Sequence, residues 1–518
     1  MKTLRKYHKW PSLIVGIFLL LTATSGIVMN HRNWFASVDF PRQLMPPDYH
    51  YRNWNLASLR GNLELSDGSQ LLYGNIGIYR TSMDFTGITD FNRGFEKGMD
   101  KRKIFTMLQT AQGELLAGTL FGLYRYNGET MAWEQMKLPG KPQRVVKLIQ
   151  NDNRIYILTR SHLYSLPDGE GLRGAIAETY IPPADNDDGK AGLFRTLWIV
   201  HSGEIFGLTG KILVDLIGLI VIFFVLSGFY YTFLPGMARR TGEATRKKLK
   251  RINRFNIRWH NKIGVYALFF LLITTVTGMF LRPPLLIPIA GSRVEPIPGS
   301  VLSGENRWDD KFRDMIIDRE DKSLILSTSE GFYRYHPETD SLARAFTVQP
   351  DVSVMGINAF GYLPDGSIMV GSFSGMYRWY PETGIVLDYL TGLPAKTPER
   401  GNPFGSLAIA GVITRDSIPV SLLEYDAGWI PLKRGKQKPE MPAEIRKLPV
   451  SLWNLSLEVH TGRIFSVILG DFYILYVPLL GITTLVILIS GILLWWKMRK
   501  KKNKKQTEGV SNENRQTA

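Results

Sequence analysis

Four long stretches of the chain are apolar and contain no charged side chain: residues 11–29, 216–234, 263–281 and 472–496. Each is about as long as an α-helix that crosses a bilayer, which takes roughly 20 residues. The pattern therefore predicts four membrane-spanning helices. The first stretch has an alternative interpretation as a cleaved signal peptide, because "TATSG" resembles a weak cleavage site.

Between these stretches, short segments alternate apolar and polar residues and are separated by Gly and Asp-Gly turns. Such alternation is typical of short antiparallel strands. Three segments are near copies: "GLYRYNGET" from Gly122, "GFYRYHPET" from Gly331 and "GMYRWYPET" from Gly375. A period of 40–50 residues is typical of propeller blades. Steps of 40 to 45 residues separate consecutive repeat tyrosines within each half, which are Tyr79, Tyr124 and Tyr164, then Tyr333 and Tyr377.

The chain is a tandem duplication. "YHKWPSLIVGIFLLLTATSGIVMN" matches "RWHNKIGVYALFFLLITTVTGMFL", so His8 corresponds to His260. "HSGEIFG" matches "HTGRIFS", so His201 corresponds to His460. Offsets between the halves are 252 and 259 residues for the membrane histidines and 254 and 253 residues for the β-segment tyrosines. A discarded signal peptide would not share its pattern with an internal helix, which favours a retained first helix.

These patterns predict the fold class. We expect an α-helical four-helix membrane bundle plus an extracytoplasmic all-β domain, a six-bladed β-propeller assembled from two tandem halves, because six pooled blades can close a ring. The expected order is helix 1 (1–30), β repeats (31–195), an outer helix with helix 2 (196–235), a basic linker (236–259), helix 3 (260–282), β repeats (283–450), an outer helix with helix 4 (451–497) and a basic tail (498–518).

The net charge of +17 is confined to three short segments beside the apolar stretches. Residues 1–11, 236–259 and 497–518 together hold 21 Lys/Arg and three acidic residues, so the rest of the chain has a net charge of −1. This distribution argues against nucleic acid as a partner. Lys and Arg in short loops mark the cytoplasmic side of a membrane. We therefore expect a multi-pass protein of a bacterial inner membrane, with both termini cytoplasmic and the β domain periplasmic.

The absence of cysteine excludes disulfides, thiolate metal ligands and covalently attached haem. The chain also contains no glycine-rich loop of the dinucleotide or nucleotide-triphosphate type. Histidine is the remaining residue type with obvious ligand chemistry, and the chain has eight.

Four histidines form a symmetric set. His8 and His260 begin helices 1 and 3 on the inner side, whereas His201 and His460 precede helices 2 and 4 on the outer side, in segments expected to continue those helices. Histidine near a bilayer is often functional and favours metals. Two imidazoles on facing helices are what a bis-histidine haem needs, and bundle cores commonly build such sites. We predict two non-covalent haem b groups, one ligated by each pair. Ordinary interfacial polar residues are the alternative.

Three further residues are weaker candidates. Gly26 follows His8 by 18 residues, and Gly278 follows His260 by 18 residues, which is five helical turns and about 27 Å. A glycine on that face admits a flat macrocycle, or it only lets helices pack closely. His31 ends helix 1 and is a candidate ligand or substrate contact. The glycine after each outer histidine is expected to let a porphyrin edge approach the backbone.

The chain resembles the PepSY-associated transmembrane family. The resemblance rests on "YHKW" entering a helix, on "HSGEIFGLTGKILVDLIGL…LSGFYY" and on "HTGRIFSVILG…ISGILLWW". That family includes inner-membrane proteins linked to iron uptake and ferric-siderophore reductases that carry b-type haem. The resemblance implies haem ligation by His8, His201, His260 and His460. Outside the membrane the chain departs from the family, because propeller-like repeats stand where a PepSY module would be.

The predicted function is electron transfer across the membrane, with possible activity as a ferric-chelate reductase. An inner donor, either a quinol or a cytoplasmic reductase, would supply electrons to an acceptor outside, and the resemblance implies a ferric siderophore or another ferric chelate. One alternative is a binding or sensing propeller anchored by four helices without redox activity. A permease is a further alternative, but it would be expected to show broken helices or intramembrane charges. The nearest candidate for such a charge is Asp215, which directly precedes the apolar stretch 216–234.

Overall fold

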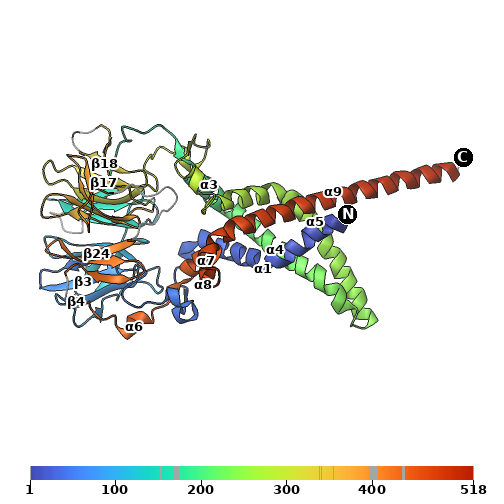
Figure 1. Cartoon of the computed structure of the whole chain (residues 1–518), viewed down its shortest axis with the longest axis horizontal. Helices are drawn as coiled ribbons and strands as arrows, with labels where there is room; N and C mark the ends of the chain where they lie inside the picture. Colours follow the sequence, from blue (N-terminus) through green and yellow to red (C-terminus); the bar gives the residue numbers. More distant parts are fainter. Residues whose placement is uncertain are drawn as a thin grey trace. The chain divides into compact units, whose positions relative to one another are not determined.

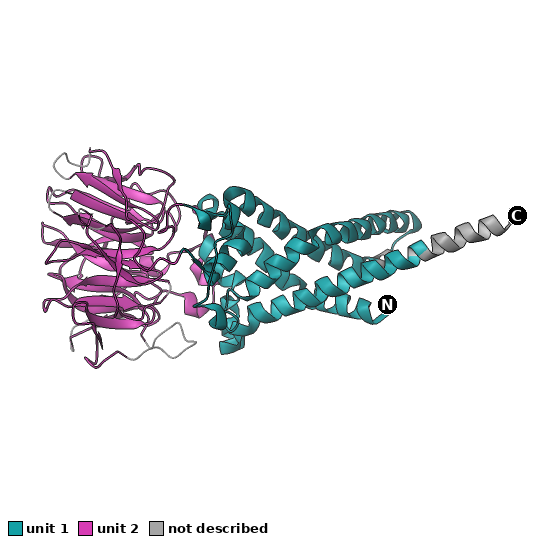
Figure 2. Ribbon diagram, turned by 90° about the horizontal axis from the view of Figure 1, so that it is seen from above, with its two compact units in different colours: residues 1–35, 189–304, 453–518 teal, residues 36–188, 305–452 magenta. Residues whose placement is uncertain are grey.

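The structure is a computed structural model that describes residues 2–516 except 152–153, 168–173, 338, 340, 354, 396–406 and 434–437. The chain forms two compact units (Figure 2). Unit 1 contains residues 1–35, 189–304 and 453–518, and unit 2 contains residues 36–188 and 305–452. Each unit therefore combines segments from both halves of the duplicated sequence.

Unit 1 is helical. Four of its helices are long and apolar enough to cross a membrane, as the sequence predicts, over Lys2–Asn30, Glu204–Leu234, Glu243–Met279 and Arg463–Lys501. The chain is therefore a membrane protein. The long helices are α1 (Lys2–Asn30), α4 (Gly207–Ala238), α5 (Glu243–Met279) and α9 (Tyr476–Gln516). The shorter helices of this unit are α2 (Arg32–Phe35), α3 (Leu193–Ser202), α7 (Leu452–His460, whose first residue lies in unit 2) and α8 (Ser466–Leu469).

The four long helices pack as a bundle in which α1 and α5 lie diagonally opposite. Both α1 and α5 contact α4 and α9 (Figure 1). Ile217, Ala267 and Leu271 form a buried cluster between α4 and α5. The duplication relates α1 to α5 and α4 to α9, so the bundle has an approximate internal twofold relation. Residues at matching positions in the two halves consequently face each other across the bundle.

The repeated phrase around each outer histidine forms a sharp turn rather than the expected helical continuation. Helix α3 ends at Ser202, and Gly203 then adopts a left-handed conformation with φ 78°. A single 3-10 turn, Glu204–Phe206, leads into α4. In the second half Gly462 has φ 75° and precedes the 3-10 turn Arg463–Phe465. Glycine tolerates this conformation at little cost. The glycine after each histidine therefore ends a helix, which corrects the expectation that these segments continue into the long helices.

Unit 2 is an all-β domain of small antiparallel sheets, three from each half of the chain. In the first half they are β2 (Gly61–Glu64), β3 (Ser69–Gly74), β4 (Gly77–Ser82) and β5 (Thr89–Asp90); β6 (Ile104–Gln109), β7 (Leu115–Thr119), β8 (Gly122–Asn127) and β9 (Ala132–Met136); and β10 (Val145–Asn151), β11 (Arg154–Thr159), β12 (Leu163–Pro167) and β13 (Ala177–Thr179).

The second half supplies β16 (Phe312–Ile317), β17 (Leu324–Thr328), β18 (Phe332–Tyr335) and β19 (Arg344–Ala345); β20 (Ile357–Tyr362), β21 (Ile368–Ser372), β22 (Gly375–Tyr380) and β23 (Ile385–Asp388); and β24 (Ile409–Arg415), β25 (Ile418–Glu424) and β26 (Gly428–Pro431). Two-stranded pairs join β1 (Asp39–Phe40) to β27 (Val450–Ser451) and, in unit 1, β14 (Ala191–Gly192) to β15 (Arg293–Val294). Helix α6 (Ala443–Arg446) completes unit 2.

The repeated tyrosines are packing residues of this domain. Each one found from the sequence lies buried on the third strand of its sheet. The second strands are almost wholly buried, as in β7 and β17. The first strand of each sheet contacts the first strand of the next, and β24 of the last sheet contacts β2 of the first. Hydrophobic side chains fill the spaces between neighbouring sheets, for example Leu116 with Leu148 and Ile316 with Phe360.

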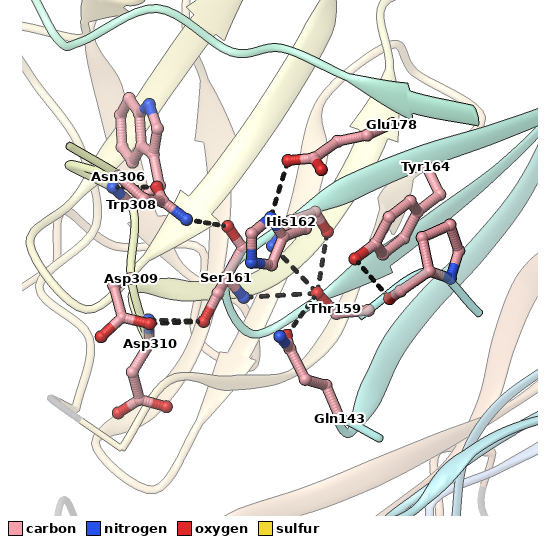
Figure 3. Close-up of polar contacts among 11 residues, drawn as sticks. Gln143, Thr159, Ser161, His162, Tyr164, Glu178, Asn306, Trp308, Asp309 and Asp310 are labelled. Carbon is pink, nitrogen blue, oxygen red and sulfur yellow. Dashed lines mark hydrogen bonds and ion pairs between the residues drawn. The ribbon is translucent and has the colours of Figure 1, made fainter. Parts of the chain in front are cut away.

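The two halves of unit 2 meet through a polar junction between the β11–β12 turn and residues 306–312 (Figure 3). The hydroxyl of buried Ser161 donates to the Asp309 carboxylate and accepts from the backbone N–H of Asp310, both at 2.9 Å. The Asn306 amide donates to the Ser161 carbonyl at 2.9 Å. Arg160 pairs with Asp310 at 2.8 Å. The segment that begins the second half is therefore fixed to the last sheet of the first.

This junction yields a stability prediction. Ser161→Ala is expected to destabilise unit 2 by about 1–3 kcal/mol, because it removes a hydrogen bond to the Asp309 carboxylate and the acceptor of the part-buried N–H of Asp310. The effect should be seen as a lower midpoint of thermal unfolding of the detergent-solubilised protein. Ser66→Ala is the matched control because Ser66 is exposed and should leave the midpoint unchanged. Equal midpoints for the two variants would contradict the role given to the junction.

Candidate functional site

The structure brings His8 and His260 together. They lie on the diagonal helices α1 and α5, and their ring centroids are 6.3 Å apart with an interplanar angle of 90°. Both residues stand near the basic end of the bundle, where residues 1–11 and 236–259 hold Lys and Arg. The two imidazoles therefore face each other across the bundle, as the sequence predicted.

The outer histidines form a second pair with similar geometry. The ring centroids of His201 on α3 and His460 on α7 are 6.1 Å apart, with an interplanar angle of 65°. Each side chain inserts between the long helices because the glycine turn that follows folds its short helix back against them. The second pair is displaced along the bundle: His460 contacts α1 at Gly26, which is 18 residues or about 27 Å from His8.

The Nδ1 atom of each histidine is held by a neighbouring helix. In three of the four the acceptor is a backbone carbonyl: Ile487 at 3.1 Å for His8, Thr274 at 2.9 Å for His201 and Thr22 at 2.9 Å for His460. His260 instead contacts the hydroxyl of Ser227 at 2.7 Å. Since a carbonyl only accepts, Nδ1 carries the proton in those three, and Nε2 keeps the lone pair.

A Ser/Thr-Gly dipeptide recurs at all four contacts, and we call it the imidazole seat. The seats are Thr277-Gly278 for His201, Ser25-Gly26 for His460, Ser490-Gly491 for His8 and Ser227-Gly228 for His260. Three of the four glycines leave room for a ring, and Gly228 borders open space instead. A Cβ at Gly278 would lie 2.7 Å from Cε1 of His201, and Cβ atoms at Gly26 and Gly491 would lie 3.2 and 3.1 Å from Cε1 of His460 and His8.

The seats revise the interpretation of Gly26 and Gly278. Both were singled out for lying on the same face as the histidine of their own helix, with room for a macrocycle. In the structure each makes room for an imidazole from the other pair. Sequence reasoning missed Gly228 and Gly491, although a Ser/Thr-Gly dipeptide in each of the four apolar stretches was the signal that would have revealed the set.

The four Nε2 atoms have no hydrogen-bond partner among the residues that the structure describes. The outer residues precede the spanning segments, and burial lowers the pKa of His201. Burial, followed by the neighbouring ring of His201, lowers the pKa of His460 to about 4. Both outer imidazoles are therefore neutral near pH 7, which is the form that binds a metal.

The spacing within each pair fits a metal ion between two imidazoles. Metal–nitrogen bonds of about 2.0 Å place the two nitrogens about 4 Å apart, and the ring centres lie behind them, on the order of 6 Å apart. The observed separations are 6.3 and 6.1 Å. Within the described part of the chain, no cluster of three or more His, Cys, Asp or Glu could hold a metal. His8 with His260, and His201 with His460, would each supply two imidazole nitrogens to a haem iron, so the residues fit the predicted haem.

His31 lies elsewhere in unit 1. Its Nε2 is 2.5 Å from a carboxylate oxygen of Asp215, and its ring stacks on Trp34 at 4.0 Å. The Asn30 amide donates to Asp215 and to the carbonyl of Ser202, both at 3.1 Å. Asp215 is thus an intramembrane carboxylate with a histidine partner, a kind of pair that is expensive and often functional in membranes. The structure places His31 in this pair rather than at either imidazole pair.

The family of PepSY-associated TM regions matches residues 5–498 of the chain. The match covers nearly all of the sequence, including both β segments, whereas the motifs recognised in the sequence lie in and beside the helices. No curated protein matches the chain.

Solved structures give only weak likenesses. The extracellular domain of the putative hybrid two component system BT4673 from B. thetaiotaomicron is 11% identical with a TM-score of 0.34, and the match covers 72% of this chain and 32% of that one. The extracellular domain of the putative hybrid two component system BT3049 from the same organism is 10% identical with a TM-score of 0.33, and the match covers 77% of this chain and 41% of that one. The chain thus spans less than half the length of these proteins. TM-scores this low support no conclusion about shared fold or function.

Proposed function

The chain belongs to the family of PepSY-associated TM regions, and from this premise we propose that it carries electrons across a membrane through two haem b groups. One group would be ligated by His8 and His260, the other by His201 and His460. The acceptor would be a ferric siderophore or another ferric chelate, which makes the protein a ferric-chelate reductase. The observation that carries the proposal is that two pairs of imidazoles lie in the bundle with similar separations between their ring centroids, 6.3 and 6.1 Å. Each imidazole contacts the Ser or Thr of a seat.

The chain's own residues account for several requirements of such a protein. The carbonyls of Thr22, Thr274 and Ile487 hold the Nδ1 protons, which orients each ring and increases the basicity of Nε2. His8 with His260, and His201 with His460, would each hold one group through two imidazole nitrogens, which would leave little reactivity towards small ligands. When bound, the haem supplies a one-electron carrier whose potential depends on its axial ligands and its burial.

The direction of transfer follows from the charges. Lys and Arg flank the His8–His260 end of the helices, which supports a cytoplasmic position for that pair. Electrons would then enter from a quinol or a cytoplasmic reductase on the inner side and leave near His201 and His460. Unit 2 would lie on the periplasmic side of a bacterial inner membrane, where it would meet the ferric chelate.

We further propose that the sheets of unit 2 are the blades of a six-bladed propeller. Three sheets come from each half of the chain, and their first strands contact one another in order from β2 to β24 and back to β2. This arrangement supports a ring with few exposed strand edges. The sheet β24–β26 has three strands where the others have four.

Reoxidation of the reduced protein tests the function. Protein purified with haem, reduced with dithionite and freed of the remaining dithionite without oxygen should show a low-spin b-type spectrum that is insensitive to carbon monoxide. Addition of ferric citrate without oxygen should restore the oxidised spectrum, with one ferrous ion formed per electron lost, captured by a ferrous-specific chelator. A gallium citrate addition is the control, because gallium(III) has similar coordination but accepts no electron. Failure of ferric citrate and of a ferric trihydroxamate to reoxidise the protein would reject ferric-chelate reduction.

A colourless protein after expression with ample haem would favour the other candidate function. Unit 2 would then act as a binding or sensing domain, and the helices would only anchor it. The seats argue against this alternative, because an anchor has no need of four imidazoles with their Nε2 atoms left free.

A further inference from the structure

Arg60 has an unusual environment inside unit 2. It directly precedes β2, the first strand of the first sheet, and its guanidinium makes one hydrogen bond, to the side-chain oxygen of Asn358 at 3.0 Å. The Nε atom is buried without a partner among the described residues. A guanidinium carries five N–H donors, so most of the hydrogen-bonding capacity of Arg60 is unused by the residues that the structure describes.

The charge of Arg60 is also uncompensated by the described residues. The ionisable groups that act on it are the phenols of Tyr73 and Tyr425, and no carboxylate is among them. Burial lowers the pKa of Arg60 to about 10, so the side chain still carries its charge at neutral pH. Asn358 is held in place by a bond from its amide to the carbonyl of Ile409 at 2.9 Å, but a neutral amide cannot balance a cation.

Other arginines of unit 2 are paired with carboxylates. Arg307 forms a two-pronged pair with Asp187 at 2.7 and 2.8 Å. Arg160 pairs with Asp310 at 2.8 Å. A charged arginine that is largely shielded from water normally has such a partner, because removing an unpaired charge from water is unfavourable. Arg60 departs from this pattern.

A second guanidinium lies close to the first. The Cζ atoms of Arg60 and Arg144 are 4.8 and 4.5 Å from the ring centroid of the same residue, Phe105. The two cationic groups are therefore within about 10 Å of each other, a range over which buried like charges repel. Arg144 precedes β10 and Phe105 is the second residue of β6, so the cluster forms where first strands of neighbouring sheets begin.

Arg313 extends the same cluster. It is the second residue of β16, and its side chain packs against Gly356, two residues before Asn358, since a Cβ at Gly356 would lie 2.4 Å from its Cδ. Arg60, Arg144 and Arg313 thus lie on or beside the first strands of three different sheets, and Nη1 of Arg313 also donates to the carbonyls of Asp310 and Phe312 at 2.8 and 3.0 Å. In the sequence they are separated by 84 and 169 residues, and no local motif joins them.

We propose that Arg60, together with Arg144 and Arg313, forms an oxyanion-binding site in unit 2. The guanidinium fork matches the two oxygens of a carboxylate or of a phosphate group. Phe105 supports the guanidiniums through its ring face. The bound anion supplies the negative charge that the described residues do not provide for Arg60. The site goes beyond the proposed electron transfer and does not depend on it.

Calorimetric titration of the purified full-length protein in a chloride buffer tests the site. Citrate and inorganic phosphate are titrated separately, which distinguishes a carboxylate from a phosphate ligand. We expect at least one of them to bind with an affinity that falls as salt rises. Arg60→Gln should weaken that binding by about tenfold or more, and Arg60→Lys should also weaken it because lysine keeps the charge but lacks the fork.

Arg93→Gln is the matched control, because Arg93 is an exposed arginine of the same unit, and it should bind the anion as the unchanged protein does. Thermal unfolding of each variant checks that unit 2 is folded. If Arg60→Gln does not fold, Arg60→Lys and Asn358→Ala carry the comparison. The proposal is overturned if neither anion binds the unchanged protein, or if the Arg60 variants bind with the same affinity as Arg93→Gln. Because this readout needs no haem, its failure is distinct from failure of the electron-transfer proposal.

Discussion

Replacement of His201 or His460 by alanine is expected to abolish the spectrum of one haem and to spare the other. The purified variant should keep about half of the b-type absorbance of the reduced protein, since the His8–His260 site lies about 27 Å further along α1 and shares no ligand with the outer site. His8→Ala or His260→Ala should have the complementary effect. The physical reason is that each proposed iron would have two protein ligands, so the loss of one imidazole would remove half of its attachment.

Combination of the variants makes this prediction sharper. The double variant within one pair, His201→Ala with His460→Ala, should lose no more b-type absorbance than either single variant. Two substitutions in different pairs, His8→Ala with His201→Ala, should leave a protein without a bis-histidine spectrum. His162→Ala is the control, because His162 contacts Glu178 in unit 2 and should have no effect. A cross-pair double variant that retained the low-spin spectrum would refute the assignment of ligands.

Glycine substitutions in the imidazole seats should produce a graded series of effects. Gly278→Ala is expected to have the largest, because the new Cβ would lie 2.7 Å from Cε1 and 3.1 Å from Nδ1 of His201. The ring is held by Thr274 at 2.9 Å and cannot move away without losing that bond. We expect the outer haem to lose its low-spin spectrum and to become reactive towards carbon monoxide.

The other seats provide internal controls of the same chemistry. Gly491→Ala and Gly26→Ala would place a Cβ 3.1 and 3.2 Å from their rings, so their effects should be smaller. Gly228→Ala meets no atom within 4 Å and should leave both spectra unchanged. Absorbance spectra with and without carbon monoxide measure the series. If Gly228→Ala perturbed a haem as strongly as Gly278→Ala, the seats would not act through steric contact with the rings.

Much of the architecture was predictable from the sequence because it depends on local pattern. A charge-free run of roughly 20 residues has few stable solutions other than a membrane helix, and all four such runs are helices in the structure. Alternation with Gly turns likewise predicted the strands around Tyr124 and Tyr377. The duplication predicted that His8 belongs with His260 and His201 with His460, since residues related by an internal repeat occupy equivalent positions on facing elements.

The tertiary structure alone decided which surfaces meet. Gly26 lies on the same face of α1 as His8, and nothing in the helical period indicates that a ring from α7 packs against it. The left-handed conformation of Gly203 breaks the helix that hydrophobicity alone predicts to continue, and this turn directs His201 towards α5. Arg60, Arg144 and Arg313 are unremarkable as sequence positions and become a cluster only where first strands from three sheets converge. Periodicity is a property of neighbours along the chain, whereas these contacts depend on packing between segments hundreds of residues apart. The sequence by itself therefore determined the elements and the histidine pairs, and the packing of those elements determined the seats that orient each imidazole.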